Sequence, residues 1–157
     1  MKFNAQEDVA APLDFVFSRV TDYQGFERSA LRRGAEVQRL HDLPFFGVGM
    51  EWDTAFDLRG KRRKMRLHVT RCDAPNTVEV SGLSKNISGL MNVDLVALSR
   101  ARTRINVEVS ISPKTLSARL FVQSMKLARA NMAKQFRARI ASLADDIEDK
   151  FRASAGT

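Results

Sequence analysis

Cysteine is nearly absent from this 157-residue sequence, and Cys72 is its single example. One cysteine cannot form an internal disulfide, and it cannot by itself build a thiolate metal site. Long hydrophobic runs are also missing, since no stretch approaches the roughly 18 consecutive apolar residues of a membrane-spanning helix. The residues after Met1-Lys2 turn polar at once and leave no apolar region of a signal peptide. The sequence therefore predicts a cytoplasmic protein in a reducing compartment.

Recognisable catalytic motifs are absent as well. The sequence has no P-loop, no G-x-G-x-x-G, no G-x-S-x-G and no H-E-x-x-H. Asp145, Asp146 and Glu148 have the composition of a metal cluster, but on a helix Asp146 pairs with Lys150 and Glu148 with Arg152 at i,i+4 spacing. We therefore expect no metal and no cofactor, and we assign no catalytic residue.

Positive charge is in excess, because 26 Lys and Arg stand against 18 Asp and Glu and give a net charge of +8. Such a field attracts nucleic acid, anionic lipid or acidic protein. A basic run over 61–66, with further arginines at 71, 100, 102 and 104, indicates a basic face. Neither a helix-turn-helix nor interleaved aromatic residues accompany it, which argues against sequence-specific reading of nucleic acid. An anionic surface of membrane, RNA or acidic protein stays open as a partner.

Length and hydrophobic periodicity predict one domain over 1–157, with an ordered core of about 2–152. Pro12 is expected to open a first helix that Gly25 interrupts, and a second short helix should end near Arg33 before Gly34. The predicted strands cover about 2–9, 35–41, 50–59, 62–70, 77–83, 87–98 and 103–111. From Ser112-Pro113 the period becomes 3.6, which predicts a single helix of about 55–60 Å ending near residue 151.

The segment 50–70 gives the clearest secondary-structure prediction, a β-hairpin, because two runs of alternating apolar and polar residues flank Gly60-Lys61. Glycine at the first turn position suits a two-residue type II′ turn. The pairs that this turn predicts are Phe56–Met65, Thr54–Leu67 and Trp52–Val69 on an apolar face, with Arg59–Arg62, Asp57–Lys64 and Asp53–His68 on the other strand face or at the turn. Pairing the apolar faces of 87–98 and 103–111 further requires an odd loop length or a β-bulge.

The N-terminal run VAAPLDFVFSRVTDYQGFERSALRRGAEV carries an Ala-Pro pair before a helix and then Thr21, Asp22, Tyr23 and Phe26. This run and the order of elements resemble the START/polyketide-cyclase/Bet v 1-like (SRPBCC) superfamily, and the opening is similar to its polyketide-cyclase and coenzyme-Q-binding branch. The resemblance implies an α+β helix-grip fold. In that fold a curved antiparallel sheet of about seven strands wraps around a long C-terminal helix, two short helices follow the first strand, and an apolar cavity lies between sheet and helix.

Candidate ligand-binding residues follow from the inward strand phases and from the stripe of the final helix. Methionine and aromatic side chains there either line an adaptable pocket or simply pack as core. The predicted apolar lining is Trp52, Phe56, Met65, Leu67, Phe121, Met125, Met132 and Phe136. Glu7, Arg39 and Thr54 also fall on inward phases, where a polar group needs a partner. Glu7 and Arg39 are expected either to pair with each other or to orient the polar head of a ligand.

The two histidines are expected at the surface, His41 at a strand end and His68 on the outward face. Ligand is expected to enter near the loop 42–49, with Phe45 and Phe46 exposed as a gate or a membrane contact, and filling the cavity at Met132 should abolish uptake. The leading hypothesis is a binder or carrier of a hydrophobic small molecule such as a lipid, an isoprenoid quinone or a polyketide-like compound. The alternatives are a cyclase or dehydratase that uses Glu7 or Thr54, with Arg39 orienting its substrate, and a basic module that docks on RNA, ribosome or anionic membrane.

Overall fold

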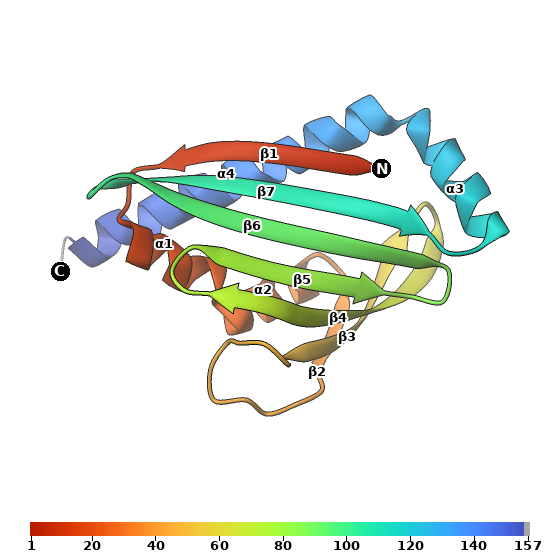
Figure 1. Ribbon diagram of the computed structural model, residues 1–157, viewed down its shortest axis with the longest axis horizontal. Coiled ribbons are helices and arrows are strands. Elements are labelled where there is room, and N and C mark those ends of the chain that lie inside the picture. The colour runs from red at the N-terminus through yellow and green to blue at the C-terminus, as the bar shows by residue number, and fades with distance from the viewer. Residues whose placement is uncertain (156–157) are drawn as a thin grey trace.

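Seven antiparallel strands form one sheet in the order β1-β7-β6-β5-β4-β3-β2 in the computed structural model (Figure 1). The structure describes residues 1–155, so the last two residues of the predicted domain lie outside the described residues. The strands are β1 (Lys2–Val9), β2 (Glu36–Arg39), β3 (Glu51–Leu58), β4 (Lys61–Asp73), β5 (Thr77–Leu83), β6 (Ile87–Ser99) and β7 (Arg102–Pro113). The helices are α1 (Leu13–Val20), α2 (Tyr23–Arg32), α3 (Leu116–Lys126) and α4 (Arg129–Ala155). The predicted α+β helix-grip architecture is confirmed.

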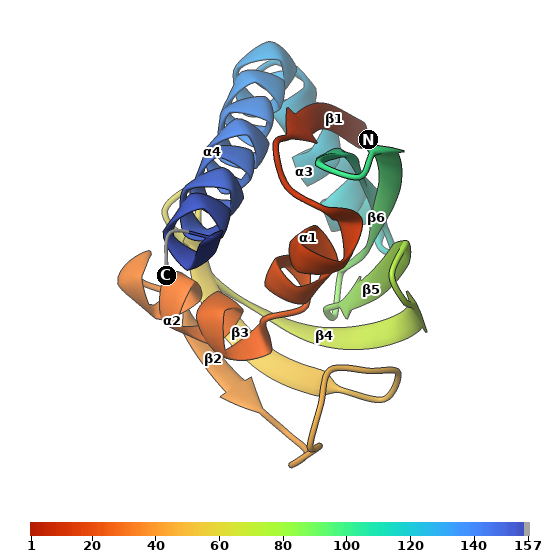
Figure 2. The same cartoon turned by 90° about the vertical axis from the view of Figure 1, so that its left-hand side faces the viewer.

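The sheet curves strongly, and its concave side receives α1 while α4 runs along β1 (Figure 2). Alternation explains which side chains point inward, because residues two apart in a strand share a face. Leu95 of β6, Ile105 of β7, Val9 of β1 and Val16 of α1 are almost completely buried, and Ile147 of α4 closes this core from the helix side. Burial of such aliphatic side chains contributes about 1.5–3 kcal/mol each.

The predicted single C-terminal helix is wrong, because two helices meet there at an angle (Figure 1). Ser112 and Pro113 do not start a helix; they continue β7 opposite Ser88 and Ile87 of β6. Thr115 caps α3 instead, and its hydroxyl accepts a hydrogen bond from the Ala118 amide at 3.1 Å. With 27 residues, α4 is about 40 Å long and not 55–60 Å.

The register predicted for the β3–β4 hairpin is also wrong. The turn residues are Arg59 and Gly60, with φ of 53° and 76°, and two positive φ values are typical of a type I′ turn. Leu58 therefore pairs with Lys61, and every predicted pair moves by two positions. The observed pairs are Phe56–Arg63, Thr54–Met65 and Trp52–Leu67 on one face, and Asp57–Arg62, Asp53–Arg66 and Glu51–His68 on the other. A shift of two keeps each side chain on its predicted face, since the strand period is two.

The boundary between the first two helices lies earlier than predicted. Gly25 does not interrupt a helix; it lies in the first turn of α2, where its amide donates to the carboxylate of Asp22 at 3.1 Å. Asp22 thus acts as the N-cap of α2. Two other predictions are confirmed: Gly34 follows α2 with φ of 85°, and a register shift between Ala97 and Ser99 aligns the apolar faces of β6 and β7.

Candidate ligand-binding pocket

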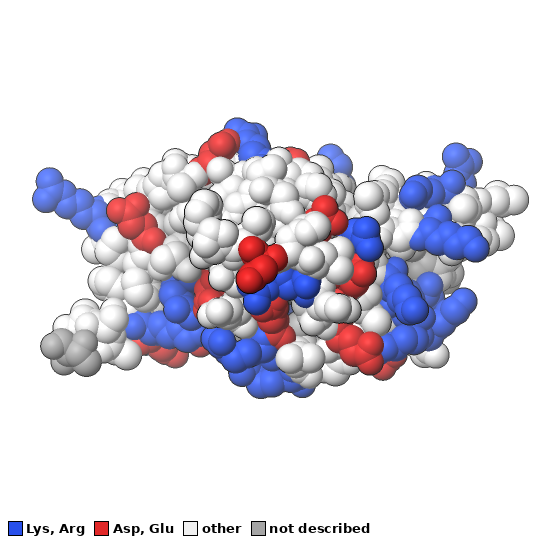
Figure 3. All heavy atoms as spheres, turned by 90° about the horizontal axis from the view of Figure 1, so that it is seen from below, with Lys and Arg blue, Asp and Glu red and all other residues white. Residues whose placement is uncertain are grey.

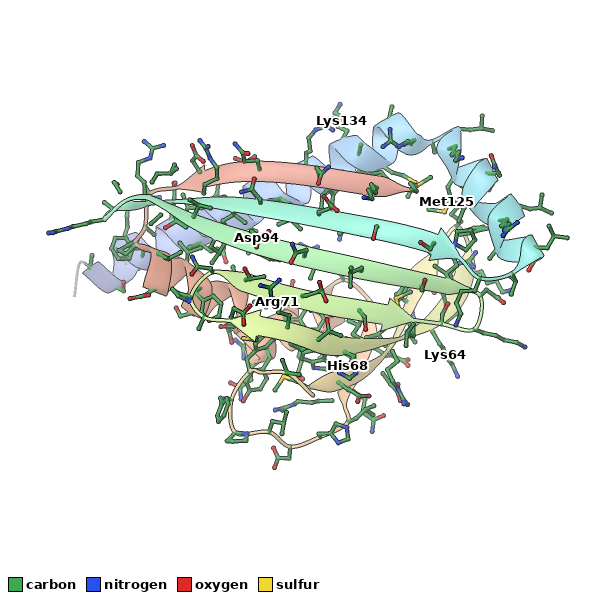
Figure 4. All side chains as sticks on the ribbon, viewed as in Figure 1. Lys64, His68, Arg71, Asp94, Met125 and Lys134 are labelled. Atoms are coloured by element: carbon green, nitrogen blue, oxygen red, sulfur yellow. The ribbon has the colours of Figure 1, made fainter. Side chains whose placement is uncertain are left out.

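An apolar pocket of about 630 Å³ opens at the end of the sheet where α3 lies. Strands β3 to β7 supply its floor and walls, and α3 covers one side of it. Figure 4 shows Met125 on α3 and Lys64 on β4 at this same end of the sheet. Apolar side chains at its centre are Phe56, Met65, Leu67, Met91, Phe121 and Met125. A volume of this size lies within the range of small-molecule sites in proteins.

Successive inward residues of β6 show where the core ends and the pocket begins. Leu95 is 2% exposed and Val93 is 6% exposed, whereas Met91, on the same face, is 37% exposed. Met91 pairs with Val80 of β5 and Val109 of β7, both of which also line the pocket. Helix α1 and the C-terminal part of α4 pack over the Leu95 end. The concave face beyond Val93 is therefore left open.

Five of the predicted ligand-binding residues line this pocket: Phe56, Met65, Leu67, Phe121 and Met125. Sequence reasoning missed Phe26 of α2, Met91 of β6 and Arg63 of β4. The signal for Met91 was present, because the inward alternation that gave Val93 and Leu95 also includes it. Alternation with Met65 and Leu67 puts Arg63 on the inward face as well, but its place in a basic run favoured a solvent-exposed interpretation.

Trp52 and Arg39 lie outside the pocket, in a cluster that holds α2 against the sheet. The Trp52 indole donates to Glu27 Oε2 at 3.1 Å, and Arg39 Nε lies 3.3 Å from the same oxygen. The Arg39 guanidinium also stacks over the Tyr23 ring, 4.8 Å from its centroid. The predicted pairing of Glu7 with Arg39 is wrong, because β1 and β2 are the two opposite edges of the sheet.

The remaining predicted ligand-binding residues also lie outside the pocket. Thr54 donates its hydroxyl proton to the Met65 carbonyl oxygen at 2.7 Å. The inward-facing hydroxyl therefore has the hydrogen-bond partner that its position requires. Phe136 packs against Phe3 with ring centroids 6.1 Å apart, because α4 lies over the edge strand β1 and not over the pocket. Met132 is half-buried on α4, and Glu7 lies on β1 opposite Ile105.

The loop 42–49 is not the mouth of the pocket. Phe45 is 71% exposed, as expected. Phe46 is half-buried and packs against the main core and against a second buried cluster of Met50, Trp52 and Val69. None of these loop residues lines the pocket. The portal prediction is therefore wrong. The pocket lining instead extends to the β3–β4 and β5–β6 turns beside α3, and this end is called its mouth below.

The mouth of the pocket is basic. Lys61, Lys64 and Lys85 line it, and the described lining residues include no aspartate or glutamate. Arg63 points to the concave side, where its guanidinium carbon lies 4.2 Å from the centroid of the Phe121 ring. Its Nε donates to the Leu58 carbonyl oxygen at 3.2 Å. A positive charge is thus held at the boundary between apolar pocket and solvent.

The convex face of the sheet carries arginines that are paired with carboxylates. Arg66 donates to Asp53 at 2.9 Å and Arg104 to Asp8 at 2.8 Å. The hydrogen bond that each aspartate accepts from its arginine lowers the pKa of that aspartate; desolvation opposes this shift, and the positive charge of the arginine adds to it. Red and blue side chains alternate over the middle of the molecule, whereas blue ones gather at the α3 end (Figure 3). Of the predicted basic face, Arg62, Arg66, Arg71 and Arg104 are therefore paired with carboxylates of the protein itself.

Both histidines lie at the surface beside one carboxylate. His68 Nδ1 is 3.6 Å and His41 Nε2 is 3.8 Å from Glu51 Oε1, and Figure 4 shows His68 on the face turned away from α4. The predicted partner Asp53 is wrong, because Asp53 binds Arg66. The outward placement of His68 and the exposure of His41 are confirmed.

The acidic residues near the C-terminus pair along the helix as predicted. Asp146 lies 2.9 Å from Lys150 and Glu148 lies 3.8 Å from Arg152. Glu148 also accepts a hydrogen bond from the Ala10 amide at 2.7 Å, which ties α4 to the end of β1. No helix among the described residues is long and apolar enough to cross a membrane.

Comparison with known proteins places the fold. No protein-family model matches the chain, and no curated protein matches it. Among solved structures, the Zhui aromatase/cyclase from Streptomyces sp. R1128 is 14% identical with a TM-score of 0.72, over 100% of this chain and 99% of that one. A norcoclaurine synthase point mutant from Thalictrum flavum is 14% identical with a TM-score of 0.67, over 99% and 96%. Ara h 8.0201 is 13% identical with a TM-score of 0.60, over 98% of each chain.

These neighbours define the class as an α+β helix-grip protein whose sheet grips a C-terminal helix. The chain has the fold of the Bet v 1-like (SRPBCC) proteins, and the resemblance predicted from its sequence is confirmed at that level.

Proposed function

We propose that this protein binds and carries a hydrophobic small molecule in the pocket between the sheet and α3. The observation that carries the proposal is Met91, an inward residue that stays 37% exposed because the concave face beyond Val93 is open. The neighbours are consistent with such a use of the fold. One structure of norcoclaurine synthase holds dopamine and hydroxybenzaldehyde, and another neighbour is named an aromatase/cyclase. We place this activity in the cytoplasm, where Cys72, the single cysteine, stays reduced.

Binding is favoured over cyclase or dehydratase chemistry by the position of the candidate acid. Glu7 lies on β1 outside the pocket, and the Thr54 hydroxyl already donates its proton to the Met65 carbonyl oxygen. General acid–base catalysis needs a titratable group within hydrogen-bond reach of the reacting atom. The residues that the enzymatic hypothesis depended on are therefore not placed for it.

The neutral fluorescent probe N-phenyl-1-naphthylamine tests this proposal, because its emission rises in an apolar site. We expect saturable binding to one site per chain. Met91→Trp should weaken that binding at least about tenfold, which corresponds to 1.4 kcal/mol, because the indole occupies the open volume. Val96→Trp is the matched control: it lies on the same strand, outside the pocket and 50% exposed. Unchanged binding by a folded Met91→Trp variant, checked by circular dichroism, would refute the proposed pocket.

A second candidate function is contact with an anionic membrane through α3. Leu116, Leu120 and Leu127 are 74%, 65% and 94% exposed, although α3 turns its other apolar residues inward. Lys126 lies in the last turn of α3, and lysine and arginine side chains gather at this end of the molecule (Figure 3). Exposed leucines flanked by lysine and arginine are typical of helices that lie in a membrane interface.

Vesicle sedimentation distinguishes this surface from a polyanion site. We expect binding to vesicles that contain phosphatidylserine, weaker binding to pure phosphatidylcholine, and loss of binding in Leu120→Gln but not in the control Val96→Gln. Rising salt should weaken the association. Equal binding by Leu120→Gln would refute the membrane contact, and so would salt-dependent binding to RNA without binding to vesicles.

A further inference from the structure

Arg63 differs from the other arginines of β4 in having no carboxylate partner. Arg62 lies 3.3 Å from Asp57, and Arg66 lies 2.9 Å from Asp53. Among the described residues, no carboxylate oxygen lies within 4 Å of Arg63. The difference follows from alternation, because Arg63 shares the inward face of β4 with Met65 and Leu67. An arginine thus faces an apolar pocket without a counter-ion from the protein's described residues.

The contacts of Arg63 hold its guanidinium in place but leave some of its hydrogen-bond donors without an acceptor among the described residues. Its Nε donates to the Leu58 carbonyl oxygen, and its guanidinium carbon lies over the Phe121 ring, an arrangement stabilised by cation–π attraction. Its two terminal nitrogens make no hydrogen bond to a described residue. Those nitrogens form the fork that binds a carboxylate, sulfonate or phosphate through two parallel hydrogen bonds. The side chain is therefore oriented before any ligand arrives.

We propose that the ligand of this pocket is an anionic amphiphile, whose apolar body lies against Met91 and Met125 and whose acidic head binds Arg63. This inference rests on the proposed function and adds the chemical class of the ligand. Lys61 and Lys85, exposed at the mouth, attract the same head group over a longer range. The shared chemistry is an oxyanion joined to a hydrophobic body, whether a fatty acid, an acidic aromatic compound or a phosphorylated isoprenoid supplies it.

Two probes with the same ring system isolate the contribution of the anion. N-phenyl-1-naphthylamine is neutral, and 1-anilinonaphthalene-8-sulfonate adds a sulfonate to the same rings. Arg63→Met keeps an apolar side chain of similar reach and removes the charge. It should weaken sulfonate binding by about 10- to 100-fold, because hydrogen bonds to charged groups are the strong ones, and change neutral-probe binding less than about twofold. The control Arg66→Met, on the outward face, should leave both affinities unchanged.

The outcomes separate this inference from the proposed function. Neutral-probe binding that is insensitive to Met91→Trp overturns the pocket itself. If the neutral probe binds in the pocket but Arg63→Met weakens both probes equally, Arg63 is a structural residue and the inference is wrong. If Arg66→Met weakens the sulfonate as much as Arg63→Met does, the effect is only general electrostatics, which also overturns it.

A measurement on the unaltered protein covers the case in which Arg63→Met does not fold. Dodecanoate and dodecanol share one alkyl chain, and the alcohol is the more hydrophobic of the two. At a pH where the acid is ionised, dodecanoate should displace the bound neutral probe at lower concentration than dodecanol. If hydrophobic burial alone drove binding, dodecanol would displace the probe at lower concentration than dodecanoate. That result would overturn the proposed head-group site.

Discussion

Replacing Glu27 with leucine tests whether Trp52 and Arg39 serve the fold and not a ligand. The Glu27 carboxylate accepts the Trp52 indole proton at 3.1 Å and lies 3.3 Å from Arg39. Trp52 is 3% exposed, so its N–H has little access to water once its acceptor is removed. The variant therefore leaves one buried donor without an acceptor and one partly buried cation without its counter-ion.

The expected loss can be worked from these two contacts. A hydrogen bond to a charged group contributes about 1.5–3 kcal/mol, and an ion pair at the surface adds at most about 1 kcal/mol. We expect Glu27→Leu to lose about 2–3 kcal/mol of unfolding free energy. In a chain of this size that lowers Tm by about 4–12 °C, at about 2–4 °C per kcal/mol.

Urea unfolding followed by tryptophan fluorescence measures this loss, because Trp52 is the only tryptophan in the chain. Glu27→Gln is the control, since its amide oxygen still accepts the indole proton; it should lose less than about 1 kcal/mol. If Glu27→Leu were within about 0.5 kcal/mol of the unaltered protein, the cluster would not hold α2, and the structural role of Arg39 would be refuted.

Three further predictions concern the turn, a buried hydroxyl and an exposed ion pair. Arg59→Asn should raise stability by a few tenths of a kcal/mol, since asparagine accepts the positive φ of a type I′ turn more readily; a lower Tm would contradict that turn type. Thr103→Val removes the bond from a fully buried hydroxyl to the Ala11 carbonyl oxygen at 2.9 Å, and should cost about 1 kcal/mol in urea unfolding. The hydrogen bond from Arg104 lowers the pKa of Asp8 in the folded protein. The stabilisation by this pair is therefore complete above the pKa that Asp8 has in the unfolded chain, and it is lost as pH falls through the lower pKa of the folded state. Asp8→Asn should thus flatten the fall in Tm between about pH 5 and pH 3, and an unchanged slope would contradict this.

Strand phases were predictable because they depend only on a period of two, and turns were not because they depend on single backbone angles. The hairpin keeps Trp52, Thr54 and Phe56 on one face in either register, so the sequence predicted their direction correctly. The register itself depended on whether Arg59 or Lys61 occupied the turn. Glycine at the first position favoured Gly60-Lys61, but the chain accepts φ of 53° at Arg59 and places Gly60 second. No propensity of arginine indicates that choice.

The site was half predictable for a related reason. Phe56, Met65, Leu67, Phe121 and Met125 line the pocket because strand and helix periodicity put them on the inward side. Periodicity does not say how far along an inward face the core extends. For this reason the prediction that Trp52 and Phe136 line the pocket was wrong. It also does not give strand order, so the edge positions of Glu7 and Arg39 were not visible in the sequence.

The break between α3 and α4 links the failed helix prediction to the existence of the pocket. The apolar stripe from Phe121 to Ile147 reads as continuous, and a straight helix carrying it would lie along one line over the sheet. The chain instead ends α3 at Lys126 and begins α4 at Arg129. As a result, Phe136 packs on β1 with α4, whereas Phe121 and Met125 face the strands at the other end with α3. Side chains of α3 line the pocket, and no described residue of α4 does. The break therefore places α3, and not α4, beside the volume next to Met91, and we expect a substitution that straightened residues 127–128 to change the pocket before it changed the core.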